Sequence, residues 1–90
     1  MAITFGQFGI IDEMRSKTEL EWFDITVKEC LERLAQRYGF TLEKIIPTGD
    51  VLNDELVVLI NGVSIDKMNR LNTVICDRDS VLLLGVVSGG

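Results

Sequence analysis

The apolar residues of this chain follow helical spacing in one segment. Between residues 27 and 38 they recur every three or four positions, while charged residues occupy the remaining positions, a pattern typical of an amphipathic helix. Thr26 and Glu29 have the spacing of a capping box, so the helix is predicted to begin at Val27. Gly39 is the expected stop, because glycine readily adopts the left-handed conformation that ends helices.

The other apolar segments have strand patterns. Runs of apolar or weakly alternating residues, bounded by glycine and polar turns, predict strands over residues 3–11, 18–23, 56–60, 63–65 and 81–87. Asn61-Gly62 is a strong signal for a hairpin turn. Residues 40–55 combine apolar positions with Pro47 and polar turn residues, which predicts an irregular segment with room for one helical turn.

The order of these elements is strand, strand, helix, strand, strand, strand. The last strand is an apolar run without polar alternation, which is typical of the middle of a sheet, often beside a parallel neighbour. We therefore expect it between the first and third strands. This predicts an α+β chain with the β-grasp, ubiquitin-like fold, in which a mixed sheet packs on one main helix. Ninety residues suit one domain, residues 1–87, followed by a tail over residues 88–90.

The tail Ser88-Gly89-Gly90 follows directly after the apolar strand. Because glycine lacks a Cβ atom, we expect the terminal carboxylate to extend on a thin, bendable segment. This ending is the strongest indication of function in the chain.

Composition argues against several classes of function. Nine basic and fourteen acidic side chains give a net charge of -5, so neither nucleic acid nor a membrane is an expected partner. The chain has no histidine, which removes the commonest general base and metal ligand, and we expect neither a metal site nor catalytic residues. Cys30 and Cys76 form no CxxC pair and are interpreted as structural. A monomer in the reducing cytoplasm is expected.

These patterns resemble a known family, the ubiquitin-like sulfur carriers of the MoaD and ThiS type, to which the ubiquitin-related and small archaeal modifiers also belong. The resemblance rests on five segments: Phe5-Gly6-Gln7-Phe8, Thr26-Val27 with the following helix, Leu59-Ile60-Asn61-Gly62, Asp79-Ser80-Val81, and Val86-Val87-Ser88-Gly89-Gly90. The chain departs from the pattern at Arg78, where many relatives have glycine, and over residues 40–55, which do not align.

The resemblance implies a role for Gly90. Its carboxylate would be adenylated by a ubiquitin-activating-type adenylyltransferase (MoeB/ThiF-like) and converted to a thiocarboxylate, with Ser88, Gly89 and Gly90 entering the partner's site. ATP and magnesium would belong to that enzyme, and this chain would be a co-substrate rather than an enzyme. Ser88 matches the small-residue position of the molybdopterin-synthase branch, which implies a role as the small subunit and the large subunit as a partner.

Strand parity predicts a docking face for such a partner. If Val81 and Leu83 face the helix, alternate residues face outward, and these are Val57, Leu59, Leu82, Leu84 and Val86. In relatives this face binds the activating enzyme, and Leu59 and Leu84 lie at the positions of its hydrophobic hot spot. The alternative is that the 40–55 segment buries these residues, or that they are ordinary apolar strand residues.

Three functional hypotheses remain open from the sequence. The first is a sulfur carrier, for molybdopterin synthesis or for tRNA thiolation or thiamine synthesis. The second is a protein modifier joined to lysines through Gly90. The third is a β-grasp binding module that works without covalent chemistry.

Overall fold

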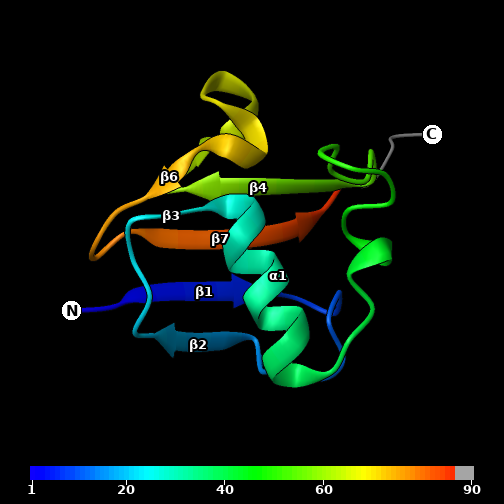
Figure 1. Ribbon diagram of the computed structural model, residues 1–90, viewed down its shortest axis with the longest axis horizontal. Coiled ribbons are helices and arrows are strands. Elements are labelled where there is room, and N and C mark those ends of the chain that lie inside the picture. Colours follow the sequence, from blue (N-terminus) through cyan, green and yellow to red (C-terminus); the bar gives the residue numbers. More distant parts are fainter. Residues whose placement is uncertain (87–90) are drawn as a thin grey trace.

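The computed structural model describes residues 1–86, which form a five-stranded mixed sheet with one helix packed across a face of it (Figure 1). The strand order is β2-β1-β7-β4-β5, and β3 and β6 form a separate two-stranded sheet. Central β7 (Ser80–Gly85) is parallel to β1 (Ile3–Gln7) and antiparallel to β4 (Leu56–Ile60). The predicted β-grasp fold is therefore confirmed, as is the central place of the last strand.

The first hairpin pairs β1 with β2 (Lys17–Leu20) in antiparallel register. Both strands are shorter than the predicted ranges, 3–11 and 18–23. The apolar residues beyond Gln7 suggest a longer strand in the sequence, but they belong to a loop in which Ile11 is buried and Phe8 is exposed. Apolar content alone therefore overestimates the length of β1.

The side chain of Gln7 explains where β1 stops. It is only 2% exposed, and it turns into the loop to bind backbone groups. Its amide nitrogen lies 2.9–3.0 Å from the carbonyl oxygens of Ile11, Met14 and Arg15, and its oxygen accepts hydrogen bonds from the N–H groups of Ile10 and Ile11. One buried side chain thus satisfies the backbone of a loop that has no ladder partner.

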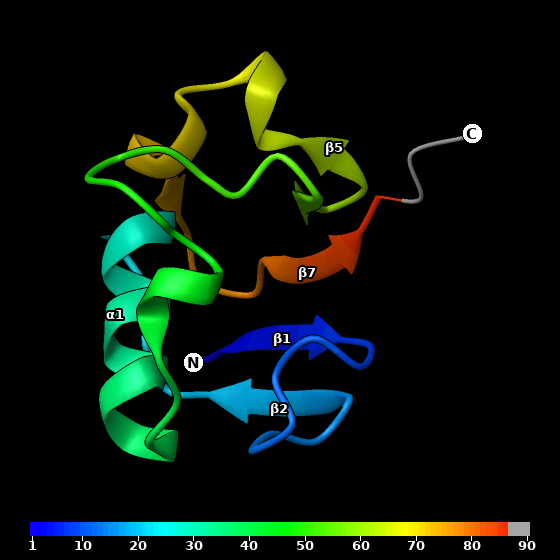
Figure 2. The same ribbon diagram turned by 90° about the vertical axis from the view of Figure 1, so that its right-hand side faces the viewer.

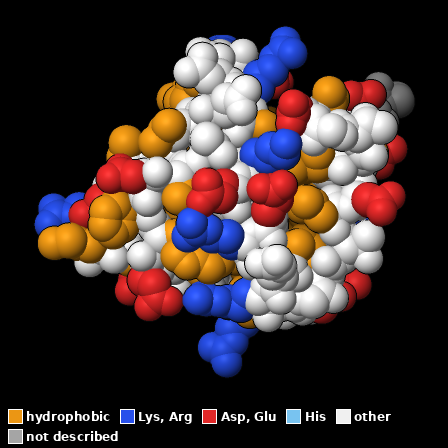
Figure 3. All heavy atoms as spheres, viewed as in Figure 1, with side chains coloured by type: hydrophobic (Ala, Val, Ile, Leu, Met, Phe, Trp, Pro, Cys, Tyr) orange, Lys and Arg blue, Asp and Glu red, His pale blue; other side chains and the backbone are white. Residues whose placement is uncertain are grey.

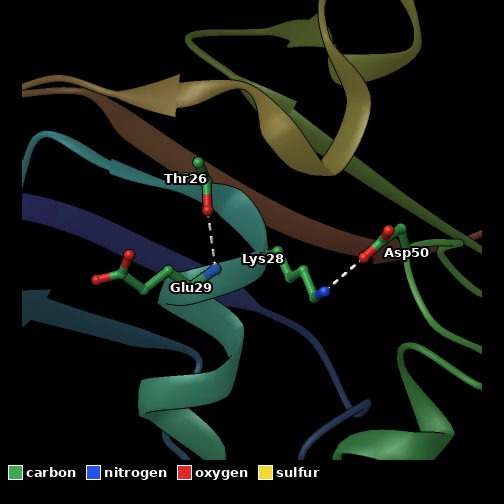
Figure 4. A network of polar contacts seen from close by, with 4 residues as sticks. All are labelled: Thr26, Lys28, Glu29 and Asp50. Carbon is green, nitrogen blue, oxygen red and sulfur yellow. Dashed lines mark hydrogen bonds and ion pairs between the residues drawn. The ribbon is translucent and has the colours of Figure 1, made fainter.

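Helix α1 (Val27–Tyr38) begins and ends where the sequence predicts. The Thr26 hydroxyl accepts a hydrogen bond of 3.1 Å from the N–H of Glu29 (Figure 4). The Glu29 carboxylate does not complete the capping box but pairs with Arg33 at 2.5 Å, so only the Thr26 half of the predicted cap is present. Gly39 ends the helix with a φ of 75°.

The segment between α1 and β4 contains the single helical turn expected there, the 3-10 helix η1 (Leu42–Lys44). Ile45 and Ile46, which follow it, are buried and join the core. An ion pair between Lys28 and Asp50 connects the segment to the first turn of α1 (Figure 4). The segment is irregular but packed.

The predicted second hairpin is present. Asn61 and Gly62 take positive φ values of 52° and 85° between β4 and β5 (Val63–Ser64), as the turn signal requires. The return strand is one residue shorter than predicted, because Ile65 begins the 3-10 helix η2 (Ile65–Lys67).

The chain between η2 and β7 contains two elements that the sequence did not indicate. A further 3-10 helix, η3 (Arg70–Asn72), precedes β6 (Val74–Ile75), which pairs with β3 (Ile25–Thr26) just before α1. β7 begins at Ser80, one residue earlier than predicted, and ends at Gly85. The predicted end of that strand at Val87 lies outside the described residues.

The core lies between the five-stranded sheet and α1. Its fully buried side chains include Ile3 and Phe5 of β1, Val58 of β4, Leu83 of β7, and Val27, Leu31 and Leu34 of α1. Burial of these apolar side chains is the main stabilising contribution to such a domain. Within residues 1–86, none of the helices has the length and apolar character needed to cross a membrane.

Candidate functional site

Strand β7 leads the chain toward the predicted tail. Its last residue, Gly85, is the register partner of Leu56 at the start of β4, and the N–H of Val86 donates to the carbonyl of Glu55 at 2.7 Å. The Val86 side chain is 48% exposed. The predicted tail residues Ser88, Gly89 and Gly90 lie outside the described residues, so the structure gives the point from which the tail begins.

The five residues of the predicted docking face are Val57, Leu59, Leu82, Leu84 and Val86, and this name is kept for them below. Four of them form two register pairs across β4 and β7, Val57 with Leu84 and Leu59 with Leu82. These four are partly exposed, whereas their alternating neighbours, such as Val81 and Leu83, are buried beneath α1. The structure therefore brings the four together on the sheet face opposite the helix.

The segment over residues 40–55 first runs along the α1 side of the sheet, at the left in Figure 2, and then crosses to the start of β4. The four paired residues of the docking face retain part of their exposure. Their role in binding a partner stays a prediction.

Polar residues border the apolar part of this sheet face. On the β1 side, Thr4 is paired with Glu19 and Ser80, and Gly6 with Lys17. On the β5 side, Leu59 is paired with Ser64. An apolar centre with a polar rim is the usual arrangement of a protein-binding surface.

The opposite, α1 side of the molecule carries charged side chains of both signs among hydrophobic and other side chains (Figure 3). Arg33 and Arg37 lie over the ring of Trp22, at 5.6 Å and 4.7 Å from its centroid. Each guanidinium also pairs with a carboxylate, Arg33 with Glu29 and Arg37 with Glu21. Exposed pairs of this kind are typical of a solvated surface, so the sheet face is the better candidate for a docking surface.

The described residues 1–86 provide no group of three metal-ligating side chains. Burial raises the pKa of the Cys30 thiol to about 12, while Cys76 is exposed in the turn before β7.

A shallow hollow of about 250 Å³ beside the start of β4 is bordered by Asp50, Asp54 and Asp66 together with Arg70 and apolar residues. It brings no nucleophile and base together, so its residues do not form the arrangement that covalent catalysis requires.

The sequence matches the family model described as the ThiS family over residues 5–90. The chain belongs to the ThiS family. It is thereby placed among the ubiquitin-like sulfur carriers and modifiers, a group of small carrier proteins. The match includes the whole docking face and the tail. A comparison with curated protein sequences found no match.

Solved structures similar to this ThiS-family protein share its fold. The small archaeal modifier protein 1 from Methanosarcina acetivorans is 25% identical, with a TM-score of 0.74, and the alignment covers 99% of this chain and 96% of that one. A chain of the BexX/CysO complex from Amycolatopsis orientalis is 19% identical, with a TM-score of 0.79 and coverage of 99% and 100%. Urm1 from Trypanosoma brucei is 18% identical, with a TM-score of 0.71 and coverage of 99% and 95%.

Sequence reasoning missed one residue of this ThiS-family protein that bears on the docking face. The sequence pattern indicates only that Gly6 is part of the first strand, whereas the structure places it beside Leu82 in the sheet. A Cβ atom at Gly6 would lie 2.9 Å from Cδ1 of Leu82. Only the register between β1 and β7 reveals this contact, so the sequence contains no signal for it.

Proposed function

We propose that this protein is a sulfur carrier whose Gly90 carboxylate is activated by a separate enzyme. The observation that carries the proposal is the ThiS-family match, which extends from β1 through the tail to residue 90. The central strand β7 supports it, because the same strand contributes to the docking face and leads to the tail.

The chemistry explains why a second enzyme is needed. A carboxylate is a poor electrophile, because its charge is delocalised and its leaving group would be oxide. In the proposed reaction the Gly90 carboxylate attacks the α-phosphate of ATP and pyrophosphate leaves. A sulfur nucleophile at the oxidation level of sulfide then displaces AMP and leaves a thiocarboxylate. The carrier supplies a reacting group, and the enzyme supplies ATP, magnesium and the active site.

The length of the tail restricts where that enzyme binds. Four residues separate Val86 from the end of Gly90, and at full extension they span at most about 14 Å. An enzyme that holds the Gly90 carboxylate must therefore reach to within that distance of the end of β7. The docking face lies on β7 and on its neighbour β4, so we propose that a MoeB/ThiF-like adenylyltransferase covers it.

The absence of side chains on Gly89 and Gly90 suits this reaction. The carboxyl group has to enter an enclosed site at a short distance from ATP, and glycine presents no Cβ atom to the walls of that site. We propose that the tail threads into the enzyme while the docking face supplies the binding energy.

We propose molybdopterin synthesis as the first pathway to test, in the cytoplasm and with the large subunit of molybdopterin synthase as the second partner. Ser88 supports this, since it matches the small-residue position of that branch. The protein that co-purifies with the untagged chain tests the assignment. If an enzyme of tRNA thiolation or thiamine synthesis co-purifies instead of the large subunit, the carrier belongs to that pathway.

A second function is favoured by the 25% identity with a small archaeal modifier. The same adenylate could pass Gly90 to the amino group of a lysine and form an isopeptide bond. Digestion of cell extracts with trypsin tests this, because the last trypsin site before the tail is Arg78, so a modifier ending at Gly90 would leave the peptide of residues 79–90 on target lysines. Finding that peptide on no other protein, in cells that contain the activated chain, would exclude the modifier.

The experiment for the carrier uses the purified chain and the adenylyltransferase of its source organism. ATP-pyrophosphate exchange should require the intact tail, and it should be lost when Gly90 is deleted or when one residue is appended after it. Circular dichroism of the two tail variants serves as the folding control. Full activity of both variants in the cell would contradict the covalent proposals and favour a non-covalent binding module.

A further inference from the structure

We propose that Gly6 is a positioning residue for the docking face. In this proposal its missing Cβ leaves a notch in β1 that receives the end of Leu82, and this sets the shape that the activating enzyme recognises. The inference rests on the proposed function, and it adds a residue on a strand outside the predicted docking face.

The backbone of Gly6 does not itself require glycine. Its φ is not among the positive values that the structure has at other glycines, such as Gly9 and Gly39. A glycine in the interior of a strand weakens that strand, because it costs more conformational entropy and packs no side chain. Its place in the middle of β1 therefore calls for another reason, and a close approach by a neighbouring group is the usual one.

The close approach comes from Leu82. A Cβ at Gly6 would lie 2.9 Å from Leu82 Cδ1, whereas its distances to the nearest backbone atoms, the carbonyl oxygens of Ser16 and Val81, would be 3.5 Å and 3.9 Å. Of these three neighbours, only the Leu82 side chain would clash with a side chain at position 6. Leu82 therefore leans over β1 on one side and faces its register partner Leu59 on the other.

An alanine at position 6 should change the surface while leaving the fold intact. The group that must move is the end of a flexible side chain rather than backbone, so β1 and β7 can keep their register. The displaced Leu82 methyl would alter the contacts of the docking face. Binding hot spots depend on well-packed complementary surfaces, so a small displacement at this place should weaken recognition.

The test compares Gly6→Ala with Gly85→Ala as the matched control. Both add one methyl group to a strand of the sheet, but, apart from Gly85 itself and its two chain neighbours, no described heavy atom lies within 4 Å of a Cβ at Gly85. With the source organism's adenylyltransferase and ATP, Gly6→Ala should raise KM for the carrier by about threefold or more and leave kcat unchanged. Gly85→Ala should have the KM of the wild-type protein, and all three proteins should melt at similar temperatures.

Removing the conflicting atoms provides a rescue. Leu82→Val lacks the Cδ atoms, so adding Gly6→Ala to Leu82→Val should raise KM no further than Leu82→Val does alone. This non-additivity is the signature of two residues that act through one contact.

Each other outcome overturns the proposal. Additive effects in the double variant would show that Gly6 and Leu82 act independently. An unchanged or lowered KM in Gly6→Ala would show that the notch has no role in recognition, and an unfolded Gly6→Ala would show that the contact belongs to the fold. Failure of the proposed function looks different, because the adenylyltransferase would then not activate the wild-type protein either.

Discussion

The side chain of Asn61 connects the β4–β5 hairpin to the turn before β7 through Asp79. Its amide group donates a hydrogen bond of 2.9 Å to the Asp79 carboxylate, and its oxygen accepts one of 2.9 Å from the N–H of Ser80. Asn61 also has a φ of 52°, in the left-handed region that asparagine tolerates better than most residues. One residue thus serves both as a turn former and as a connection to the central strand.

We predict that Asn61→Gly lowers the free energy of unfolding by about 1–2 kcal/mol, because glycine keeps the left-handed backbone but loses both side-chain hydrogen bonds. Asn61→Ala should cost about 1 kcal/mol more, since alanine loses the same bonds and adds backbone strain. Urea unfolding measures both values. Equal stability of the two variants would show that the turn conformation contributes nothing.

Replacing the buried Gln7 should be more costly than replacing the exposed residue after it. Gln7→Leu would leave several backbone groups of the loop without partners, and we expect a loss of about 3 kcal/mol in the free energy of unfolding. Phe8→Ser changes a side chain that is 64% exposed, and its effect should stay within about 0.5 kcal/mol. Faster hydrogen exchange at the Ile10 and Ile11 amides in Gln7→Leu would locate the damage. Similar losses in both variants would contradict this role of Gln7.

Cys30 should make the protein less stable at alkaline pH. Burial holds its pKa at about 12 in the folded state, against an ordinary value of 9.0. Above pH 9 the unfolded chain can release the thiol proton while the folded chain retains it, so stability falls as the pH rises from 9.0 toward 12. The slope from this residue approaches about 1.4 kcal/mol per pH unit.

Cys30→Ala isolates that contribution, because the other alkaline titrations are common to both proteins. The difference in unfolding free energy between Cys30→Ala and the wild-type protein should shift in favour of the variant above pH 9.

At neutral pH, a thiol reagent should label exposed Cys76 quickly and Cys30 only after unfolding. Rapid native labelling of both cysteines would contradict the burial of Cys30.

The docking face should be required for activation and not for folding. Leu59→Asp or Leu84→Asp places a charge on the apolar centre of the face, and we expect kcat/KM for adenylation to fall by about 30-fold or more. Val74→Asp is the control, since Val74 is exposed on β6, outside the docking face. Normal activation of the two leucine variants would remove the docking face from the mechanism.

The elements that local sequence determines were predictable. The hydroxyl of Thr26 and the left-handed Gly39 define α1 at its two ends, and Asn61-Gly62 defines the second hairpin. β7 is apolar at each position from Val81 to Leu84, on both faces of the sheet, which is typical of a central strand, so its central position could be predicted as well.

The features that depend on distant partners could not be predicted. β3 and β6 have two residues each and exist only because Ile25 and Ile75 meet in the fold. The end of β1 depends on the side chain of Gln7, which binds a loop up to eight residues away. The notch at Gly6 depends on the register between β1 and β7, so no pattern within either strand predicts it.

The mass of the intact chain after activation tests the central claim most directly. The protein is incubated with its adenylyltransferase, ATP, magnesium and sulfide, and then analysed by mass spectrometry with fragmentation. We predict that one oxygen is exchanged for sulfur, that the exchange lies in the Gly90 carboxyl group, and that it requires ATP. A chain that forms the adenylate but returns with an unchanged mass would contradict the assignment as a sulfur carrier.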